Sequence, residues 1–172
     1  MSTVAIIMAG GLGKRMNTTT PKVLVKLGEV PMINRVIKTL TQLSSHTNLE
    51  KIIIVVGQYK SEIEHSIGLL NSKLNICYVT QDVPQGTGHA IMCCEKELLQ
   101  YKDSDILILS GDVPLLSAST IRNLLSMKTD VKLVTTKLDD PTGYGRIITK
   151  NGLFDKIVEQ KDCDVSQLYE KT

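Results

Sequence analysis

Short apolar runs alternate with segments of helical period along most of the chain. Residues 3–8 and 51–56 are continuous apolar runs rich in β-branched side chains, which are typical of strands buried on both faces. Between them, the apolar residues of 31–44 recur every three or four positions, and Pro31 suits a first helical turn. This pattern predicts a strand, a helix and a second strand.

The same alternation continues towards residue 136. We expect further strands at residues 76–79, 106–109 and 131–136, and helices at residues 61–70, 88–101 and 119–127. Strands that alternate with helices form βαβ units, in which the strands run parallel. The sequence therefore predicts an α/β, Rossmann-like fold with a mostly parallel sheet and helices on both faces.

After residue 136 the pattern changes to glycine-containing loops and two short strands. Residues 146–149 and 154–159 flank an Asn-Gly pair at 151–152, which predicts a β-hairpin. Residues 160–172 are polar and show no clear period. We expect one domain, with a βαβ core at residues 1–136 and a smaller hairpin region at residues 137–172.

Composition narrows the class of protein. The chain has 172 residues, 42% of them hydrophobic and 22% charged, which fits a globular domain with a buried core. A formal net charge of only +2 does not indicate a large basic surface for binding nucleic acid or membrane. The residues show no export signal, no apolar run of about twenty residues and no Cys-x-x-Cys pair, so we expect a cytoplasmic protein. They leave open whether it forms a homo-oligomer.

A glycine-rich loop follows the first predicted strand. In an open parallel sheet, ligands bind beyond the carboxyl ends of the strands, where this loop should lie. Its glycines allow backbone N–H groups to approach phosphate oxygens, and its cations add charge-assisted donors. The glycines are Gly10, Gly11 and Gly13, and the cations are Lys14, Arg15 and Lys22. Together they predict a polyphosphate site, although a surface loop with incidental basic residues is the alternative.

Two common phosphate loops are excluded by single residues. A dinucleotide-binding fingerprint needs glycine where Met16 stands, and a Walker loop needs serine or threonine where Arg15 stands. A dehydrogenase on a similar sheet is therefore not expected.

Five spaced motifs resemble those of the sugar nucleotidyltransferases. They are Met-Ala-Gly-Gly-Leu-Gly-Lys-Arg-Met at 8–16 with Pro-Lys-Val-Leu at 21–24, Gln-Gly-Thr-Gly-His-Ala at 85–90, Gly-Asp-Val-Pro-Leu at 111–115, Asp-Asp-Pro-Thr-Gly-Tyr-Gly-Arg-Ile at 139–147 and Val-Glu-Gln-Lys-Asp at 158–162. This order is similar to that of the bacterial-type UDP-N-acetylglucosamine pyrophosphorylases, the uridylyltransferase domain of a bifunctional acetyltransferase/uridylyltransferase. The resemblance implies the Rossmann-like nucleotide-diphospho-sugar transferase fold.

The resemblance also implies a role for each matching residue. Arg15 and Lys22 would be catalytic, and Asp112 would bind Mg²⁺. The nucleotide-binding residues would be Ala9, Gly10, Gly11, Gly13, Lys14, Gln81, Gly86 and Thr87. The sugar-binding residues would be Tyr144, Gly145 and Glu159.

Several of these roles have a structural alternative. Gln81 and Glu159 could be strand-end polar residues, Thr87 could cap a helix, and Asp112 could be a turn residue before proline. We assign His89 to structure rather than to general-base catalysis, because attack by an ionised phosphate needs no base.

The implied activity is Mg²⁺-dependent formation of UDP-N-acetylglucosamine and pyrophosphate from UTP and N-acetylglucosamine 1-phosphate. The alternatives are a nucleotidyltransferase for another sugar phosphate or nucleoside triphosphate, and a non-catalytic nucleotide-binding module. Lys14 replaces the usual threonine of the family, and Gly10 replaces the usual alanine of this branch. The family continues beyond the segment that ends here with further sugar and metal ligands, so we expect a truncated nucleotidyltransferase domain in which Asp112, phosphates and water hold the metal.

Overall fold

The chain divides into two compact units, Met1–Lys128 and Thr129–Thr172. The computed structural model describes residues 2–11, 20–70 and 73–172. The division falls before residue 136, where the sequence pattern placed the end of the core.

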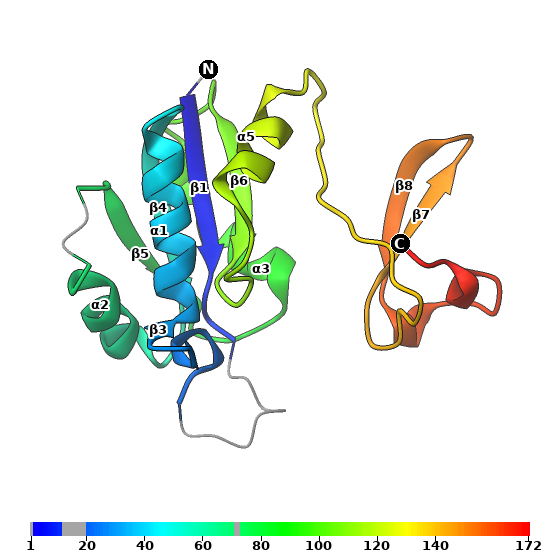
Figure 1. Ribbon diagram of the computed structural model, residues 1–172, viewed down its shortest axis with the longest axis horizontal. Helices are drawn as coiled ribbons and strands as arrows, with labels where there is room; N and C mark the ends of the chain where they lie inside the picture. Colours follow the sequence, from blue (N-terminus) through cyan, green and yellow to red (C-terminus); the bar gives the residue numbers. More distant parts are fainter. Residues whose placement is uncertain (1, 12–19, 71–72) are drawn as a thin grey trace. The chain divides into compact units, whose positions relative to one another are not determined.

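The first unit contains a parallel four-stranded sheet. Its strands are β1 (Ser2–Met8), β4 (Asn48–Val56), β5 (Ile76–Thr80) and β6 (Asp105–Ser110). They are ordered β5-β4-β1-β6, and every neighbouring pair is parallel (Figure 1). The predicted α/β class with a parallel sheet is confirmed.

Helices cover both faces of this sheet. The helices are α1 (Met32–Ser44), α2 (Lys60–Gly68), α3 (Thr87–Met92), α4 (Glu95–Leu98) and α5 (Ala118–Ser126). Successive side chains of a strand point to opposite faces. Accordingly, Ala5 and Ile7 of β1 pack in the cluster that includes α1, α2 and α5, whereas Val4 and Ile6 pack with Ala90 of α3.

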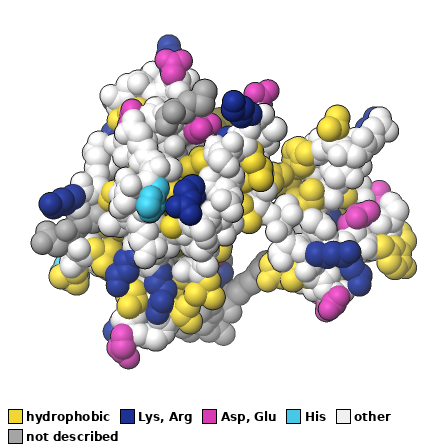
Figure 2. Space-filling view, turned by 45° about the horizontal axis from the view of Figure 1, so that its top comes forward, with side chains coloured by type: hydrophobic (Ala, Val, Ile, Leu, Met, Phe, Trp, Pro, Cys, Tyr) yellow, Lys and Arg dark blue, Asp and Glu magenta, His cyan; other side chains and the backbone are white. Residues whose placement is uncertain are grey.

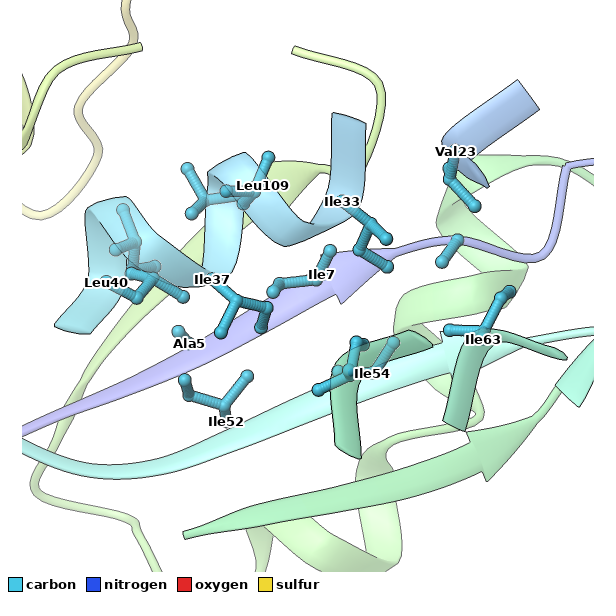
Figure 3. Packing of buried hydrophobic residues seen from close by; sticks show 14 of the residues in the cluster. Ala5, Ile7, Val23, Ile33, Ile37, Leu40, Ile52, Ile54, Ile63 and Leu109 are labelled. Carbon is cyan, nitrogen blue, oxygen red and sulfur yellow. The ribbon is translucent and has the colours of Figure 1, made fainter. Parts of the chain in front are cut away.

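The larger core lies between α1 and the sheet. Ile33 and Ile37 of α1 face Ile7 of β1 and Ile54 of β4, as Figure 3 shows. All four side chains are completely buried. Burying each isoleucine contributes about 1.5–3 kcal/mol, so the three-to-four-residue spacing in this helix holds it on the sheet.

A short segment before α1 was not predicted. It comprises the 3₁₀ helix η2 (Lys22–Leu24) and a small hairpin of β2 (Lys26–Leu27) and β3 (Val30–Pro31). Val23 of η2 is buried against the main core, which fixes the neighbouring Lys22 beside the sheet.

The second unit is built on the predicted hairpin. Strands β7 (Arg146–Lys150) and β8 (Leu153–Val158) pair antiparallel, and Asn151 and Gly152 both have positive φ, as an Asn-Gly hairpin turn requires. The hairpin prediction is confirmed. Two 3₁₀ helices follow, η3 (Gln160–Asp162) and η4 (Gln167–Tyr169).

Two predicted elements differ in the structure. Residues 131–136 form no strand, and Val131 and Val134 are largely exposed, so that prediction is wrong. The predicted helix at 88–101 is divided into α3 and α4, because the N–H of Cys94 bonds to the carbonyl of Ile91 and interrupts the α-helical hydrogen bonds.

No helix among the described residues has the length and apolar character needed to cross a membrane. Basic and acidic side chains are interspersed on the face seen in Figure 2.

The four cysteines are free thiols.

Candidate functional site

The loops that follow β1 and β6 meet at the carboxyl edge of the sheet. Met8 and Ser110, the last residues of the two strands, are register partners, and the N–H of Gly111 donates to the carbonyl of Met8 at 3.0 Å. From β1 the chain continues to β4, which is the neighbour of β1 on one side, and then to β5 beyond it. The later strand β6 is the neighbour of β1 on the opposite side, so the strand order reverses at β1. Ligands of open α/β sheets bind at such a reversal of strand order.

A cavity of about 260 Å³ opens at this edge. Its lining comprises Met8, Gly10, Gly11, Lys22, Val23, Gln81, Pro84, Gly86, Thr87, Ala90, Ser110 and Asp112. These residues come from the ends of β1 and β6, from the loops after β1, β5 and β6, from η2 and from α3. An apolar wall with a few converging polar groups is the usual composition of a small-molecule site.

Lys22 and Asp112 form an ion pair in this cavity. Lys22 Nζ lies 2.6 Å from Asp112 Oδ2, and Ser110 Oγ donates to Asp112 Oδ1 at 2.5 Å. Partial burial opposes ionisation of Asp112, but the hydrogen bonds from Lys22 and Ser110 outweigh it, and the pKa of this carboxyl is lowered. Asp112 is therefore an anion at neutral pH, held beside a cation.

The lowered pKa of Asp112 predicts a pH-dependent contribution to stability. Its stabilisation is fully present above the ordinary aspartate value of 3.8 and is lost as the pH falls through the lower folded-state pKa. We expect the melting temperature of Asp112→Asn to lie on the order of 2–4 °C below that of the parent at pH 7, and the gap to be smaller at pH 3, which is below the ordinary aspartate value of 3.8. Thermal unfolding at both pH values measures this. A gap that widens in acid would contradict the assignment.

Two glycines allow the loops to approach closely. A Cβ at Gly111 would lie 3.1 Å from Val23 Cγ1 and 3.2 Å from the carbonyl oxygen of Met8. A Cβ at Gly57, which follows β4, would lie 3.1 Å from the carbonyl oxygen of Gly10. Larger side chains would push the loops apart, so these positions shape the cavity.

The far side of the cavity is built around Gln81. The residue is 7% exposed, and its Nε2 donates to the carbonyl of Gly86 at 3.1 Å and lies 3.0 Å from Nδ1 of His89. Gly86 has a φ of 100°, which favours glycine. Thr87 is the first residue of α3, whose N-cap is Gly86 without a side-chain cap bond, so the capping alternative for Thr87 is wrong.

The other predicted residues of the glycine-rich loop, including the catalytic Arg15, have three different outcomes. Gly10 and Gly11 line the cavity. Ala9 does not, because its side chain is buried and its N–H donates to the carbonyl of Val55 at 2.8 Å. Gly13, Lys14 and Arg15 lie outside the described residues.

The predicted sugar-binding residues belong to the second unit. A Cβ at Gly145 would lie 4.0 Å from Glu159 Oε1, so the hairpin brings these two residues together. The side chains of Tyr144 and Glu159 are exposed. Arg146, the residue after Gly145, is buried. Its guanidinium donates to the carbonyl oxygens of Pro141 and Tyr144, and these hydrogen bonds order the loop before β7.

The carboxylate oxygens of Asp112 are suitable ligands for a magnesium ion. Its carboxylate already faces one cation, and carboxylate oxygen is a preferred ligand of Mg²⁺. Within residues 2–11, 20–70 and 73–172, three or more His, Cys, Asp or Glu side chains nowhere gather as a metal cluster. Magnesium is commonly held by one or two carboxylates together with substrate phosphates and water, which fits this single carboxylate.

Several residues of the site were not identified from the sequence. Ser110 orients Asp112, and Val23 and Ala90 supply the apolar wall. Ser110 could have been found from the sequence, because it directly precedes the Gly-Asp motif at a strand end. Nothing in the sequence distinguishes Val23 and Ala90 from other apolar residues of the core.

Comparison with protein families places residues 5–159 in the MobA-like NTP transferase domain. The chain is 37% identical to the "Bifunctional protein GlmU" of Clostridium acetobutylicum over 169 residues, which cover 95% of this chain and 35% of that protein. It is 42% identical to a "Probable UDP-N-acetylglucosamine pyrophosphorylase" of Acanthamoeba polyphaga mimivirus over 166 residues, which cover 94% and 63%. The chain thus spans only part of these relatives.

Solved structures share the fold. A Bacillus anthracis crystal structure assigned to a glucose-1-phosphate thymidylyltransferase superposes with a TM-score of 0.73 at 22% identity, covering 92% of this chain and 64% of the other. At this identity the likeness concerns the fold alone.

Proposed function

The chain belongs to the MobA-like NTP transferase family, and on this premise we propose that it transfers the uridylyl group of UTP to N-acetylglucosamine 1-phosphate. The products are UDP-N-acetylglucosamine and pyrophosphate. The relatives with 36–42% identity support this choice, because their names are those of GlmU and of a UDP-N-acetylglucosamine pyrophosphorylase.

One observation carries the proposal. Lys22 and Asp112, which the motifs assign to phosphate and metal, lie 2.6 Å apart in one cavity with Gly10, Gly11 and Gln81. A triphosphate needs cations and backbone N–H groups at one end, whereas a base needs an amide and apolar surface at the other. The cavity offers both sets of groups.

The reaction is an in-line displacement. A phosphate oxygen of the sugar phosphate forms a bond to the α-phosphorus of UTP, and the bond from that phosphorus to the pyrophosphate oxygen breaks. The attacking oxygen is already ionised, so no general base is required. Lys22, together with Arg15 of the glycine-rich loop, would neutralise charge that develops on the phosphoryl oxygens.

Asp112 would be the protein ligand of Mg²⁺. A bound magnesium ion would neutralise charge on the triphosphate and help to orient it. Asp112 supports that role by its ionised state and by the Ser110 hydrogen bond, which fixes the carboxylate. Tyr144, Gly145 and Glu159 of the second unit are proposed to contact the sugar, since Gly145 and Glu159 lie close together on the hairpin.

A coupled assay of pyrophosphate release tests the proposal. With Mg²⁺, UTP and N-acetylglucosamine 1-phosphate, we expect equal amounts of pyrophosphate and UDP-N-acetylglucosamine, the latter measured by chromatography. Parallel reactions with CTP, dTTP and GTP, and with glucose 1-phosphate, should be slower.

Two results would contradict the proposal. Faster transfer from another triphosphate or to another sugar phosphate would point to a different nucleotidyltransferase. Tight UTP binding in calorimetry without product would favour a nucleotide-binding module.

A further inference from the structure

The His89 ring lies against the carboxamide of Gln81, which the proposed reaction uses to contact the base. Gln81 is almost completely buried at the end of β5, and its backbone N–H donates to the carbonyl of Val56 at 2.8 Å. The backbone is therefore fixed. What remains to be determined is whether the oxygen or the nitrogen of the side-chain amide faces the cavity.

Two neighbours determine that choice. The carbonyl oxygen of Gly86 can only accept, so the nitrogen of the amide must face it, at 3.1 Å. The same nitrogen lies 3.0 Å from Nδ1 of His89. An amide nitrogen carries two hydrogens, and one can be donated to each neighbour if Nδ1 is an acceptor. This requires the imidazole proton to be on Nε2.

The oxygen of the amide is then left for a ligand. Oε1 lies on the side of Gly10, since a Cβ built there would be 3.4 Å from it, and both residues line the cavity. Among the hydrogen bonds of the described residues, none is donated to Oε1. As far as the described residues go, the site thus presents an acceptor that receives no hydrogen bond from the protein.

We propose that His89 is a positioning residue that holds the Gln81 amide with its oxygen towards the cavity and thereby selects uracil over cytosine. This inference rests on the proposed function, because it concerns the base of the same nucleotide. Uracil presents an N–H at ring position 3, which an oxygen acceptor satisfies. Cytosine presents a lone pair there, which the oxygen repels. His89 acts through Gln81, not on the reacting atoms.

The expected effect is a loss of base selectivity. Without His89, only the bond to Gly86 still opposes rotation of the amide. Turning the nitrogen to a cytosine then breaks one hydrogen bond instead of two. Since one hydrogen bond contributes about 1 kcal/mol net, the ratio of CTP to UTP dissociation constants should fall about fivefold in His89→Leu. Calorimetry with each nucleotide and Mg²⁺ measures this ratio.

Isosteric substitutions separate positioning from packing. The side-chain oxygen of asparagine can occupy the place of Nδ1 and accept from Gln81, whereas that of glutamine reaches the place of Nε2. We expect His89→Asn to keep most of the selectivity and His89→Gln to behave like His89→Leu. Equal ratios in the parent, His89→Leu and His89→Gln would overturn the proposal. The exposed His65→Asn is the matched control.

The tautomer gives a second measurement that needs no nucleotide. In ¹⁵N NMR of the unmodified chain near neutral pH, His89 should show an unprotonated Nδ1 and a protonated Nε2, and Gln81→Met should weaken this preference. A protonated Nδ1 in neutral His89 would overturn the proposal even if His89→Leu fails to fold. If the parent chain binds neither UTP nor CTP, the proposed function fails, and base selection fails with it, whereas the NMR result still decides the contact between the two side chains.

Discussion

Replacing Asp112 by asparagine is expected to lower kcat for UDP-N-acetylglucosamine formation by about 100-fold or more, because the site loses the anion that would hold magnesium against the triphosphate. Asparagine keeps the size of the side chain and can still accept from Ser110. The cavity should therefore remain, and the melting temperature should change by only a few degrees. Initial rates over a range of Mg²⁺ concentrations measure the effect.

Two controls accompany this substitution. Ser110→Ala removes the hydrogen bond that orients Asp112 but leaves the carboxylate, so we expect a loss of less than about tenfold. Asp103→Asn changes an exposed aspartate elsewhere on the first unit and should have no effect. An unchanged kcat in Asp112→Asn would remove Asp112 from the metal site, and an equal loss in all three variants would indicate a general effect on folding.

The second large effect is expected at Arg15. Arg15→Ala should lower kcat on the order of 100-fold, by analogy with the removal of other donors that stabilise transition-state charge. Arg15→Lys should recover part of the loss, because lysine keeps the charge but cannot donate two parallel hydrogen bonds. KM for UTP should rise less than kcat falls if the contact strengthens in the transition state.

Arg122 provides the matched control for Arg15. It is exposed on α5, and Arg122→Ala removes the same charge from the same unit. The assignment of Arg15 fails if Arg15→Ala retains its kcat, or if Arg122→Ala loses as much activity. Arg15 lies outside the described residues, so its role stays a prediction from the motif.

The centre of the sheet could be predicted from the sequence because β1 and the second half of β4 are buried on both faces. Such strands are continuous apolar runs, and residues 3–8 and 51–56 contain little else. The strand predicted at 131–136 was wrong because an apolar run is not sufficient to form a strand. A strand needs a partner, and the local pattern of residues does not say whether one is available.

The family resemblance, drawn from five short motifs, is confirmed by the relatives and by the matching domain. The motifs name residues but give no positions in space. Lys22 and Asp112 are 90 residues apart in the sequence and 2.6 Å apart in the fold, because β1 and β6 are neighbours in the sheet. Their pairing follows from the strand order.

Residue order alone determined the class of fold, the hairpin at Asn151-Gly152 and the family, because periodicity, turn chemistry and motifs are local properties. Tertiary structure alone decided which polar groups share a cavity. The sequence assigned His89 only to structure, whereas the fold brings its Nδ1 within 3.0 Å of Gln81. The fold also buries Ala9, whose N–H is used by the sheet. Such contacts depend on how distant strands and helices pack, which no local pattern specifies.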